Sequence, residues 1–403
     1  MNTIGLTLGA LFGFALAATA GDPQWQHLSS KRGDLPVPPG GSQQQTGALI
    51  GDFDGDGVND FILSFRQKPP ALVWYRRTAN GWETYVIDKD YLTVEAGGAA
   101  YDIDGDGDLD VVFGGDWQSN QVWWWENPAS HFDQATPWKR HVIKKDGKTQ
   151  HHDQTFGDFL GTGKAQLAFW NQQAKALFLA EIPAHPRTAD GWPLTAIVSG
   201  TSAGSTPYTE GMSAGDIDGD GKIDLLAYNA WYKHTGGKDF QATKIADVGG
   251  LIFAGQLVEG GLPEIVISPG DGSGPVKWYA CQGDPTRTGS WVGHDLIGRD
   301  VIHGHSLQLG DINGDGHLDI FVAEMAKWHE QQPQPDNPKA TAWIFYGDGK
   351  GDFRKTELVV GEGWHEARLA DLDGDGGLDL LNKPYNWETP RVDVWLNNGT
   401  AKR

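Results

Sequence analysis

Three histidines and one glutamate share one position of a repeated pattern, where together they could hold a metal ion or move protons. The pattern is a loop of aspartates and glycines, here called the aspartate loop. The residues six positions before each loop are Thr46, Ala96, His152, Glu210, Gly250, His305 and His365. Imidazoles beside a carboxylate suit a transition metal such as Zn²⁺, or acid–base chemistry near neutral pH. Any one of these histidines could instead be a hydrogen-bonded structural residue, so the hypothesis depends on the shared register.

Other polar residues lie close to this column in the sequence. They are His151, His303, Tyr208, Glu95 and Arg368. Together with the column they form one group of candidate catalytic residues: His152, Glu210, His305, His365, Tyr208, His303 and Arg368.

A second group of candidates consists of aromatic and basic residues in segments between expected strands. Flat aromatic side chains with charged neighbours suit the binding of sugars. The candidate substrate-binding residues are Trp117, Trp231, Trp328, Tyr385, Trp387, Lys383 and Arg66. The chain has 18 tryptophans, so packing between sheets is the alternative role for some of them.

The aspartate loop itself reads D-x-D/N-G-D-G-x-x-D/N and occurs five times. Oxygens at its first, third, fifth and ninth positions can converge because the intervening glycines permit a tight turn, and an all-oxygen set favours Ca²⁺. We therefore expect about five structural calcium ions. The ligands would be Asp52, Asp54, Asp56 and Asp60; Asp102, Asp104, Asp106 and Asp110; Asp216, Asp218, Asp220 and Asp224; Asp311, Asn313, Asp315 and Asp319; and Asp371, Asp373, Asp375 and Asp379. The alternative is a set of solvated acidic turns.

Two eroded copies, starting at Asp158 and Gln256, bring the number of repeats to seven. Successive copies start 40 to 60 residues apart, which leaves room for four short strands in each. In the second copy we expect strands at 99–101, 110–113, 121–125 and 138–143. The last copy lacks an outer strand, and residues 25–29 could supply it. These features predict an all-β, seven-bladed β-propeller with four-stranded blades, closed by pairing of the N- and C-terminal strands.

These loops resemble the FG-GAP/VCBS repeats that also build the head of integrin α subunits. The resemblance covers nearly all of the chain after residue 20. It implies a seven-bladed propeller whose aspartate loops lie on the face opposite the functional one. Column residues would then converge near the mouth of the central channel.

The chain also resembles propeller-type polysaccharide lyases and the propeller domain of fungal aldos-2-ulose dehydratase. This second resemblance implies elimination chemistry on a sugar. His152, His305 or His365 would then abstract a proton, and Tyr208 or a second histidine would protonate the leaving oxygen. Arg368 or a metal would stabilise the negative charge that develops.

Composition limits the partners and the location. Residues 1–20 are uncharged, with an apolar run and a small-x-small end, which predicts a signal peptide rather than a membrane anchor. Residues 21–403 would form a single propeller domain, secreted and not inserted in a membrane. A net charge of −21 disfavours nucleic acid, and the single cysteine, Cys281, excludes an internal disulfide.

Two functions remain open at this point. The first is a secreted, calcium-stabilised lyase or dehydratase acting on a uronic-acid polysaccharide or related sugar. The second is a non-catalytic carbohydrate- or protein-binding propeller, of the lectin or adhesion kind. A glycoside hydrolase is less favoured, since it needs two carboxylates at a defined separation and Glu210 with Glu95 is only a weak candidate pair. The sequence leaves the oligomeric state open.

Overall fold

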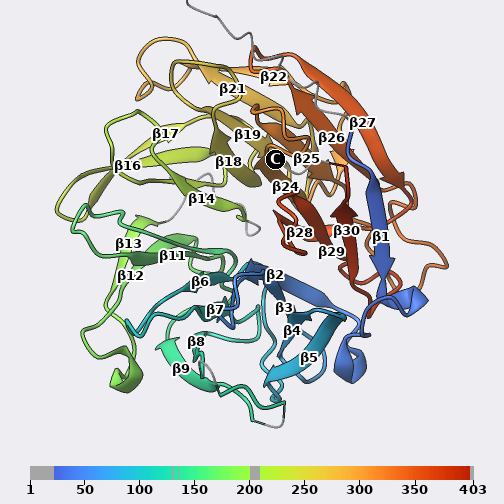
Figure 1. The fold of residues 1–403 in the computed structure, drawn as a ribbon. Helices are drawn as coiled ribbons and strands as arrows, with labels where there is room; N and C mark the ends of the chain where they lie inside the picture. The colour runs from blue at the N-terminus through green and yellow to red at the C-terminus, as the bar shows by residue number, and fades with distance from the viewer. Residues whose placement is uncertain (1–21, 129–130, 135, 200–208, 400–403) are drawn as a thin grey trace, which may run out of the picture.

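The computed structural model describes residues 22–128, 131–134, 136–199 and 209–399, and it arranges them as a ring of seven antiparallel sheets around a central axis (Figure 1). The predicted signal peptide lies outside the described residues. Three short 3₁₀ helices are the only helical elements in the described part: η1 (Ser30–Arg32), η2 (Pro39–Gly41) and η3 (Pro186–Thr188). None of the described helices has the length and apolar character needed to cross a membrane.

Each sheet is one blade of four strands, which are given below in order from the innermost to the outermost. Blades 1 to 3 are β2 (Gln45–Gly51), β3 (Asp60–Phe65), β4 (Leu72–Thr78) and β5 (Gly81–Asp88); β6 (Ala99–Tyr101), β7 (Asp110–Gly114), β8 (Val122–Glu126) and β9 (Lys139–Lys144); and β10 (Gln154–Gly157), β11 (Gln166–Asn171), β12 (Ala176–Glu181) and β13 (Leu194–Ser199).

Blades 4 to 7 follow the same order. They are β14 (Met212–Gly215), β15 (Asp224–Ala227), β16 (Ala230–Gly236) and β17 (Asp239–Lys244); β18 (Leu251–Gly255), β19 (Glu264–Ser268), β21 (Lys277–Cys281) and β22 (Trp291–Asp295); β24 (Ser306–Gly310), β25 (Asp319–Ala323), β26 (Thr341–Gly347) and β27 (Phe353–Val360); and β28 (His365–Ala370), β29 (Asp379–Lys383), β30 (Asp393–Asn397) and β1 (Trp25–Ser29). A two-stranded ribbon, β20 (Ser273–Gly274) with β23 (Val301–Ile302), is attached to blade 5.

The core consists of seven hydrophobic clusters, each of which lies between two neighbouring blades. The second strand of every blade is buried along its whole length because both of its faces meet a neighbouring sheet. In blade 1, for example, Phe61 packs toward blade 7 and Ile62 packs toward blade 2. The ring is therefore stabilised by burial between blades rather than by one central core.

The two ends of the chain close the ring as predicted. Strand β1 (blue in Figure 1) pairs antiparallel with β30 (red), and Trp25 lies opposite Asn397. His27 stacks on Trp395 with a ring-centroid distance of 4.0 Å and contacts Asp393 at 3.1 Å. The predicted strands of the second copy agree with β6 to β9 to within one residue at each boundary.

Candidate functional site

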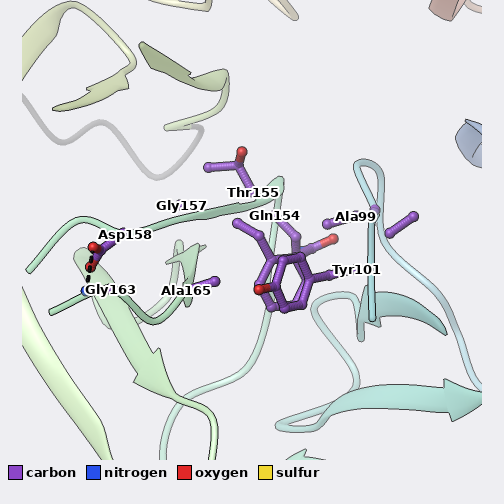
Figure 2. A pocket seen from close by; sticks show the side chains of 11 residues that line it. Ala99, Tyr101, Gln154, Thr155, Gly157, Asp158, Gly163 and Ala165 are labelled. Atoms are coloured by element: carbon purple, nitrogen blue, oxygen red, sulfur yellow. Dashed lines mark hydrogen bonds between the residues drawn. The ribbon is translucent and has the colours of Figure 1, made fainter. Parts of the chain in front are cut away.

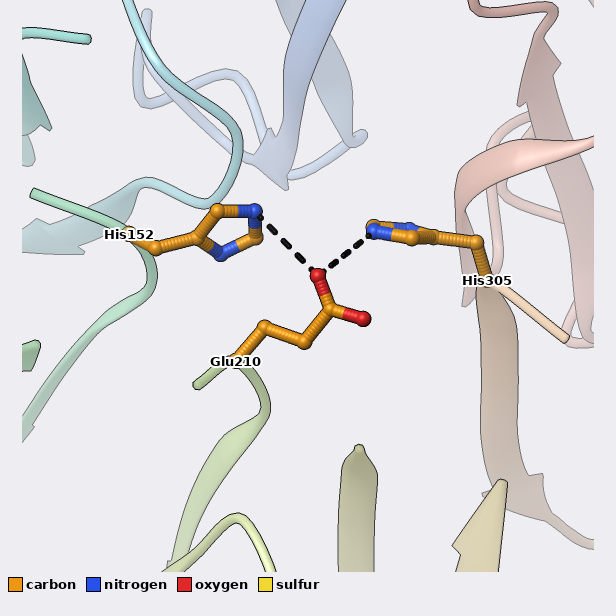
Figure 3. Close-up of side chains that lie close together, drawn as sticks. All are labelled: His152, Glu210 and His305. Atoms are coloured by element: carbon orange, nitrogen blue, oxygen red, sulfur yellow. Dashed lines mark hydrogen bonds and ion pairs between the residues drawn. The ribbon is translucent and has the colours of Figure 1, made fainter. Parts of the chain in front are cut away.

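The column residues meet at the axis, on the face of the ring opposite the aspartate loops. Each stands at or just before the start of an innermost strand, so ring symmetry turns the column inward. Nε2 of His305 lies 3.3 Å from Oε2 of Glu210, and Nε2 of His152 lies 3.7 Å from the same oxygen (Figure 3). One ligand atom from each of these three buried residues lies within 4.8 Å of the other two. The structure thus places two imidazoles and one carboxylate, from blades 3, 4 and 6, around a single point.

Carboxylates surround both histidines. Nδ1 of His152 lies 2.7 Å from Asp153, and Nδ1 of His305 lies 3.6 Å from Glu366. Burial alone would lower the pKa of His152, but Asp153 and Glu210 oppose this and raise the pKa to about 9. Burial also tends to lower the pKa of His305, but the nearby carboxylates, chiefly Glu210, outweigh this effect and raise it. The cluster therefore favours positive charge at its centre.

His365 belongs to the cluster but differs from the other two histidines in its electrostatics. Its ring stacks on His305 with a centroid distance of 4.4 Å, and Nζ of the buried Lys383 lies 2.6 Å from its Nδ1. The lysine has two further acceptors, the carbonyl oxygens of Gln45 and Thr46, at 3.1 and 2.5 Å. Burial and Lys383 hold the pKa of His365 well below its usual value. His365 is therefore neutral near pH 7 and can accept a hydrogen bond from Lys383 at Nδ1.

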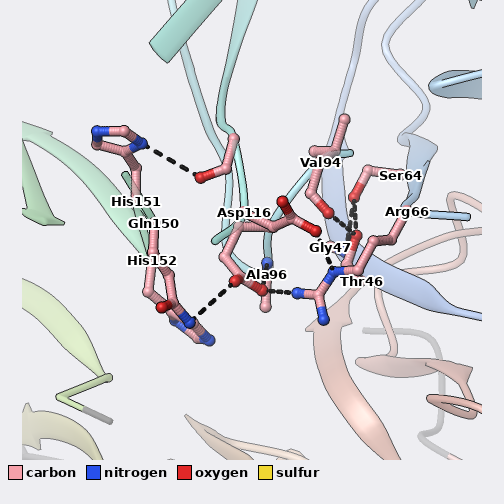
Figure 4. A network of polar contacts seen from close by, with 12 residues as sticks. Thr46, Gly47, Ser64, Arg66, Val94, Ala96, Asp116, Gln150, His151 and His152 are labelled. Atoms are coloured by element: carbon pink, nitrogen blue, oxygen red, sulfur yellow. Dashed lines mark hydrogen bonds and ion pairs between the residues drawn. The ribbon is translucent and has the colours of Figure 1, made fainter. Parts of the chain in front are cut away.

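A small cavity of about 120 Å³ opens over the cluster. Its walls are Arg66, Glu95, Ala96, Gln150, His152, Gln172, Glu210, Asp271, His305, Lys327, His365 and Tyr385. Arg66 lies in a polar network with Glu95 and Asp116, partly drawn in Figure 4, and donates to the Tyr385 hydroxyl at 3.0 Å. Burial raises the pKa of Tyr385, so the phenol is protonated at neutral pH.

A wider cavity of about 490 Å³ adjoins the small one and shares Glu210, Asp271 and Lys327 with it. Its other walls include the aromatic ring of Tyr228 together with Val248 and Pro269. Lys327 and Asp271 form an ion pair at 2.9 Å. A ligand with one end at the cluster could therefore extend into this second cavity.

Two further hollows lie along the axis on the other side of the cluster. One, of about 340 Å³, reaches Asp153 and Glu366 from below. The other, of about 630 Å³, lies between the innermost strands of blades 2 and 3, with Tyr101 and Asp158 among its walls (Figure 2). None of the three column residues of Figure 3 lines either hollow.

Two of the candidate catalytic residues that the structure describes are not part of the cluster. Arg368 donates to the carbonyl oxygen of Ala48 at 2.9 Å and is not among the walls of the small cavity. His303 contacts the carbonyl oxygen of Asp271 and the Asp336 carboxylate outside that cavity. Tyr208 lies outside the described residues.

Two of the candidate substrate-binding residues are buried instead of presented to a ligand. Trp231 is fully buried in the core between blades 4 and 5, because the β15–β16 turn is short and leaves it within a strand. Lys383 is buried beneath His365 and surrounded by acceptors, so it cannot reach a ligand. Both predictions are corrected accordingly.

The other candidate substrate-binding residues occupy different places. Arg66 and Tyr385 line the small cavity. Trp117 is 59 % exposed, while Trp328 and Trp387 are half-buried. Trp328 is tied to the blade 7 segment through its backbone, since its N–H donates to Asn386 at 2.9 Å.

Residues of the site that were absent from the predicted set include Asp153, Glu366, Asp271 and Gln172. Asp153 and Glu366 could have been found, because each directly follows a histidine of the column. Asp271 and Gln172 come from loops of unequal length, which have no common register.

The aspartate loops lie on the opposite face, and their aspartates converge in part. Three carboxylates approach one another in each of four loops: Asp52, Asp54 and Asp56; Asp102, Asp104 and Asp106; Asp216, Asp218 and Asp224; and Asp371, Asp373 and Asp379. The loop at Asp311 has Asn313 in its third position, and the amide of Asn313 donates to Asp315 at 2.9 Å. In the eroded copy, Asp158 accepts from the backbone N–H groups of Thr162 and Gly163. Basic side chains already contact some loops, as Arg76 does at Asp54.

Comparison with known proteins gives the fold and no closer relationship. No protein-family model matches the chain, and no curated protein is similar to it in sequence. Among solved structures, BBS1N in complex with ARL6DN, soaked with lead, matches with a TM-score of 0.53 and 11 % identity, covering 91 % of this chain and 96 % of that chain. The V. cholerae biofilm matrix protein Bap1 matches with a TM-score of 0.49 and 12 % identity, covering 91 % and 90 %. The β-propeller domain of Myceliophteria thermophila Cps50 (Swd1) matches with a TM-score of 0.49 and 11 % identity, covering 89 % and 97 %. At 11 % identity, the match to BBS1N shows a likeness in fold alone.

Proposed function

We propose that the protein is a metal-dependent sugar dehydratase or lyase, and that its site is the axial cluster of His152, Glu210 and His305. One observation carries this proposal: two buried imidazoles and one carboxylate converge within 4.8 Å at the base of a cavity. Two histidines and one glutamate are a set of ligands that binds Zn²⁺ in some hydrolytic enzymes.

The residues present fit such an ion. Ligand atoms in a tetrahedral zinc site lie about 3.4 Å apart, given metal–ligand distances of about 2.0–2.1 Å. The nitrogens of His305 and His152 lie 3.3 and 3.7 Å from the Glu210 oxygen. Carboxylates beyond the ligand histidines, here Asp153 and Glu366, are common at metal centres. When bound, the ion would polarise a carbonyl group of the substrate and so acidify the neighbouring C–H.

The remaining polar residues of the cavity suit an elimination. Asp271, whose side chain is 38 % exposed, takes the proton from the carbon beside the carbonyl. The carbon–oxygen bond at the next carbon breaks as the double bond forms, and Tyr385 protonates the departing oxygen. His365 donates a hydrogen bond from Nε2, as its neutral state allows. A leaving hydroxyl departs as water, and a leaving glycosidic oxygen departs as an alcohol.

The charges in the cavity favour a neutral sugar over a uronate polymer. Its arginine and its lysine are already paired among the described residues, Arg66 with Glu95 and Lys327 with Asp271. A substrate carboxylate would therefore meet no unpaired arginine or lysine there. The 120 Å³ cavity suits one end of a small hydroxy-carbonyl sugar, and the 490 Å³ cavity would take the remainder.

The test combines metal analysis with a substrate screen. In excess calcium, neutral ketoses and aldosuloses are compared with uronate oligosaccharides, and ultraviolet absorbance with mass spectrometry detects unsaturated products. We expect zinc-dependent turnover of a neutral sugar. His305→Ala should lose zinc and reduce turnover by about 10²-fold or more. The exposed His294, stacked on Trp278 in blade 5, provides the control His294→Ala. Full turnover without zinc or in His305→Ala would contradict the proposal.

We further propose that the protein is exported and binds calcium at its five complete aspartate loops. The convergent carboxylates of four of these loops and the apolar, uncharged first 20 residues support this. Expression in an exporting host, with N-terminal sequencing and calcium analysis of the secreted product, tests both parts. An uncleaved N-terminus would contradict export, and a calcium-free product would contradict the loop assignment.

The exposed Trp117 favours one second candidate, a carbohydrate-binding module without turnover. In that case sugar binding, measured by calorimetry, would be lost in Trp117→Ala and retained in His305→Ala. The enzyme proposal instead expects turnover to be lost in His305→Ala and retained in Trp117→Ala.

A further inference from the structure

Two carboxylates next to the axial cluster stand at a repeat position that is glycine in three of the other five copies. The residues five positions before the loop starts are Gly47, Gly97, Asp153, Gly211, Leu251, Ser306 and Glu366. Gly97 and Gly211 have left-handed backbone, with φ of 104° and 87°. Asp153 and Glu366 have left-handed backbone too, with φ of 46° and 54°. This conformation is uncommon for residues with a side chain and strains the backbone.

The strained conformation places both carboxylates at the rear of the cluster. Asp153 Oδ2 lies 2.7 Å from Nδ1 of His152, and Glu366 Oε1 lies 3.6 Å from Nδ1 of His305. Both side chains are buried. Nδ1 of His305 and Oε1 of Glu366 have no hydrogen-bond partner among the described residues. A small rotation of either side chain would let Nδ1 of His305 donate a hydrogen bond to Oε1 of Glu366. If Nε2 of His305 binds a metal ion, Nδ1 carries the proton for this hydrogen bond.

We propose that Asp153 and Glu366 are positioning residues that orient His152 and His305, so that both Nε2 atoms face Glu210. Glycine would relieve the backbone strain at both positions, but it has no carboxylate to orient a histidine. The identity of the bound metal in this inference rests on the proposed function. The orientation of the two imidazole rings does not.

The competing explanation is that both carboxylates have a purely structural role. Asp153 accepts from the N–H of Gly211 in blade 4 at 2.6 Å, and Glu366 pairs with Arg368 at 2.5 Å. A purely structural role predicts that their loss lowers stability and leaves the histidine rings, and any metal affinity, unchanged.

Glycine substitutions separate the two explanations, because they remove the carboxylate and relieve the strain together. Zinc affinity is measured at 25 °C by competition with a chromogenic chelator, in excess calcium. We expect Asp153→Gly and Glu366→Gly each to weaken zinc binding by about tenfold or more. The control is Lys175→Gly, since Lys175 is exposed in the β11–β12 turn and has φ of 53°. It should keep full affinity. A smaller loss than tenfold in both site variants would overturn the proposal.

A second measurement does not depend on metal. Crystal structures of metal-free wild type and variants report the ring orientations, and we expect His152 to rotate in Asp153→Gly and His305 to rotate in Glu366→Gly. Asp153→Asn, which keeps an acceptor at the same distance, should preserve the ring of His152. Should the glycine variants not fold, the alanine variants serve instead. Wild type that binds no zinc would refute the proposed metal, whereas unmoved rings would refute the positioning role.

Discussion

At the scale of single residues, the pair of Lys383 and His365 has the sharpest consequence for stability. Lys383→Met removes the donor of three hydrogen bonds and leaves two carbonyl oxygens and one imidazole nitrogen buried without it. We expect a loss of about 2–4 kcal/mol in the free energy of unfolding, measured by denaturant titration. The exposed Lys355 on β27 provides the control Lys355→Met, which should stay within about 0.5 kcal/mol of wild type. An equal effect of the two changes would contradict the role of Lys383.

The axial cluster could be predicted from the sequence at this scale because a ring converts equal register into spatial convergence. His152, Glu210 and His305 were found in this way. Register says nothing about rotamers or tautomers, so the neutral state of His365 could not be foreseen. Asp271 and Lys327 reach the cavity from loops of unequal length, which repeat analysis cannot align.

At the scale of the elements, complete and eroded aspartate loops should respond differently to calcium. Asp104 lies in a complete loop, beside Asp106, whereas Asp158 in the eroded loop accepts two backbone N–H groups. We expect Asp104→Ala to lower the melting temperature in calcium and to have little effect in chelator, because the empty loop gains relief from charge repulsion. Asp158→Ala should lower it equally in both conditions. A calcium-independent effect of Asp104→Ala would show that this loop binds no ion.

The ninth residue of the loops gives a pH dependence to the chelated protein. Burial raises the pKa of Asp110 to about 8 and those of Asp60, Asp319 and Asp379 to about 7. In the unfolded chain these groups titrate near about 3.9. The folded protein therefore binds protons that the unfolded chain has released, and the stability they contribute is complete below about pH 4. Without calcium, thermal melts should show a decline in stability as pH rises through about 7–8, and calcium should suppress this decline. A flat profile in chelator would contradict the burial of these aspartates.

Strand order was also predictable from the loops, since each loop marks the first turn of a blade. Side-chain burial was less so. Trp231 was expected in a segment between strands, yet the two-residue connection at Tyr228 and Asn229 puts it inside β16. The spacing of repeats fixes the number of strands but not the length of an individual turn.

At the scale of the whole molecule, stability depends on the join between the two ends. Deleting residues 21–33 removes β1, which supplies the outer strand of blade 7 and the ring stacked on Trp395. Because neighbouring blades share their cores, we expect a lower melting temperature for the entire domain, seen alike by tryptophan fluorescence and circular dichroism. Retention of the wild-type melting temperature would show that β1 is dispensable for closure.

The axial site also has a consequence for biosynthesis. Its three proposed ligands come from blades 3, 4 and 6, and its carboxylate Glu366 comes from blade 7. A nascent chain that has not reached residue 366 lacks part of this set, and an open arc of blades would not bring its two sides together. An unfinished chain would therefore have scattered ligands and little capacity to capture zinc, so that the proposed metal would be acquired only when the ring is complete.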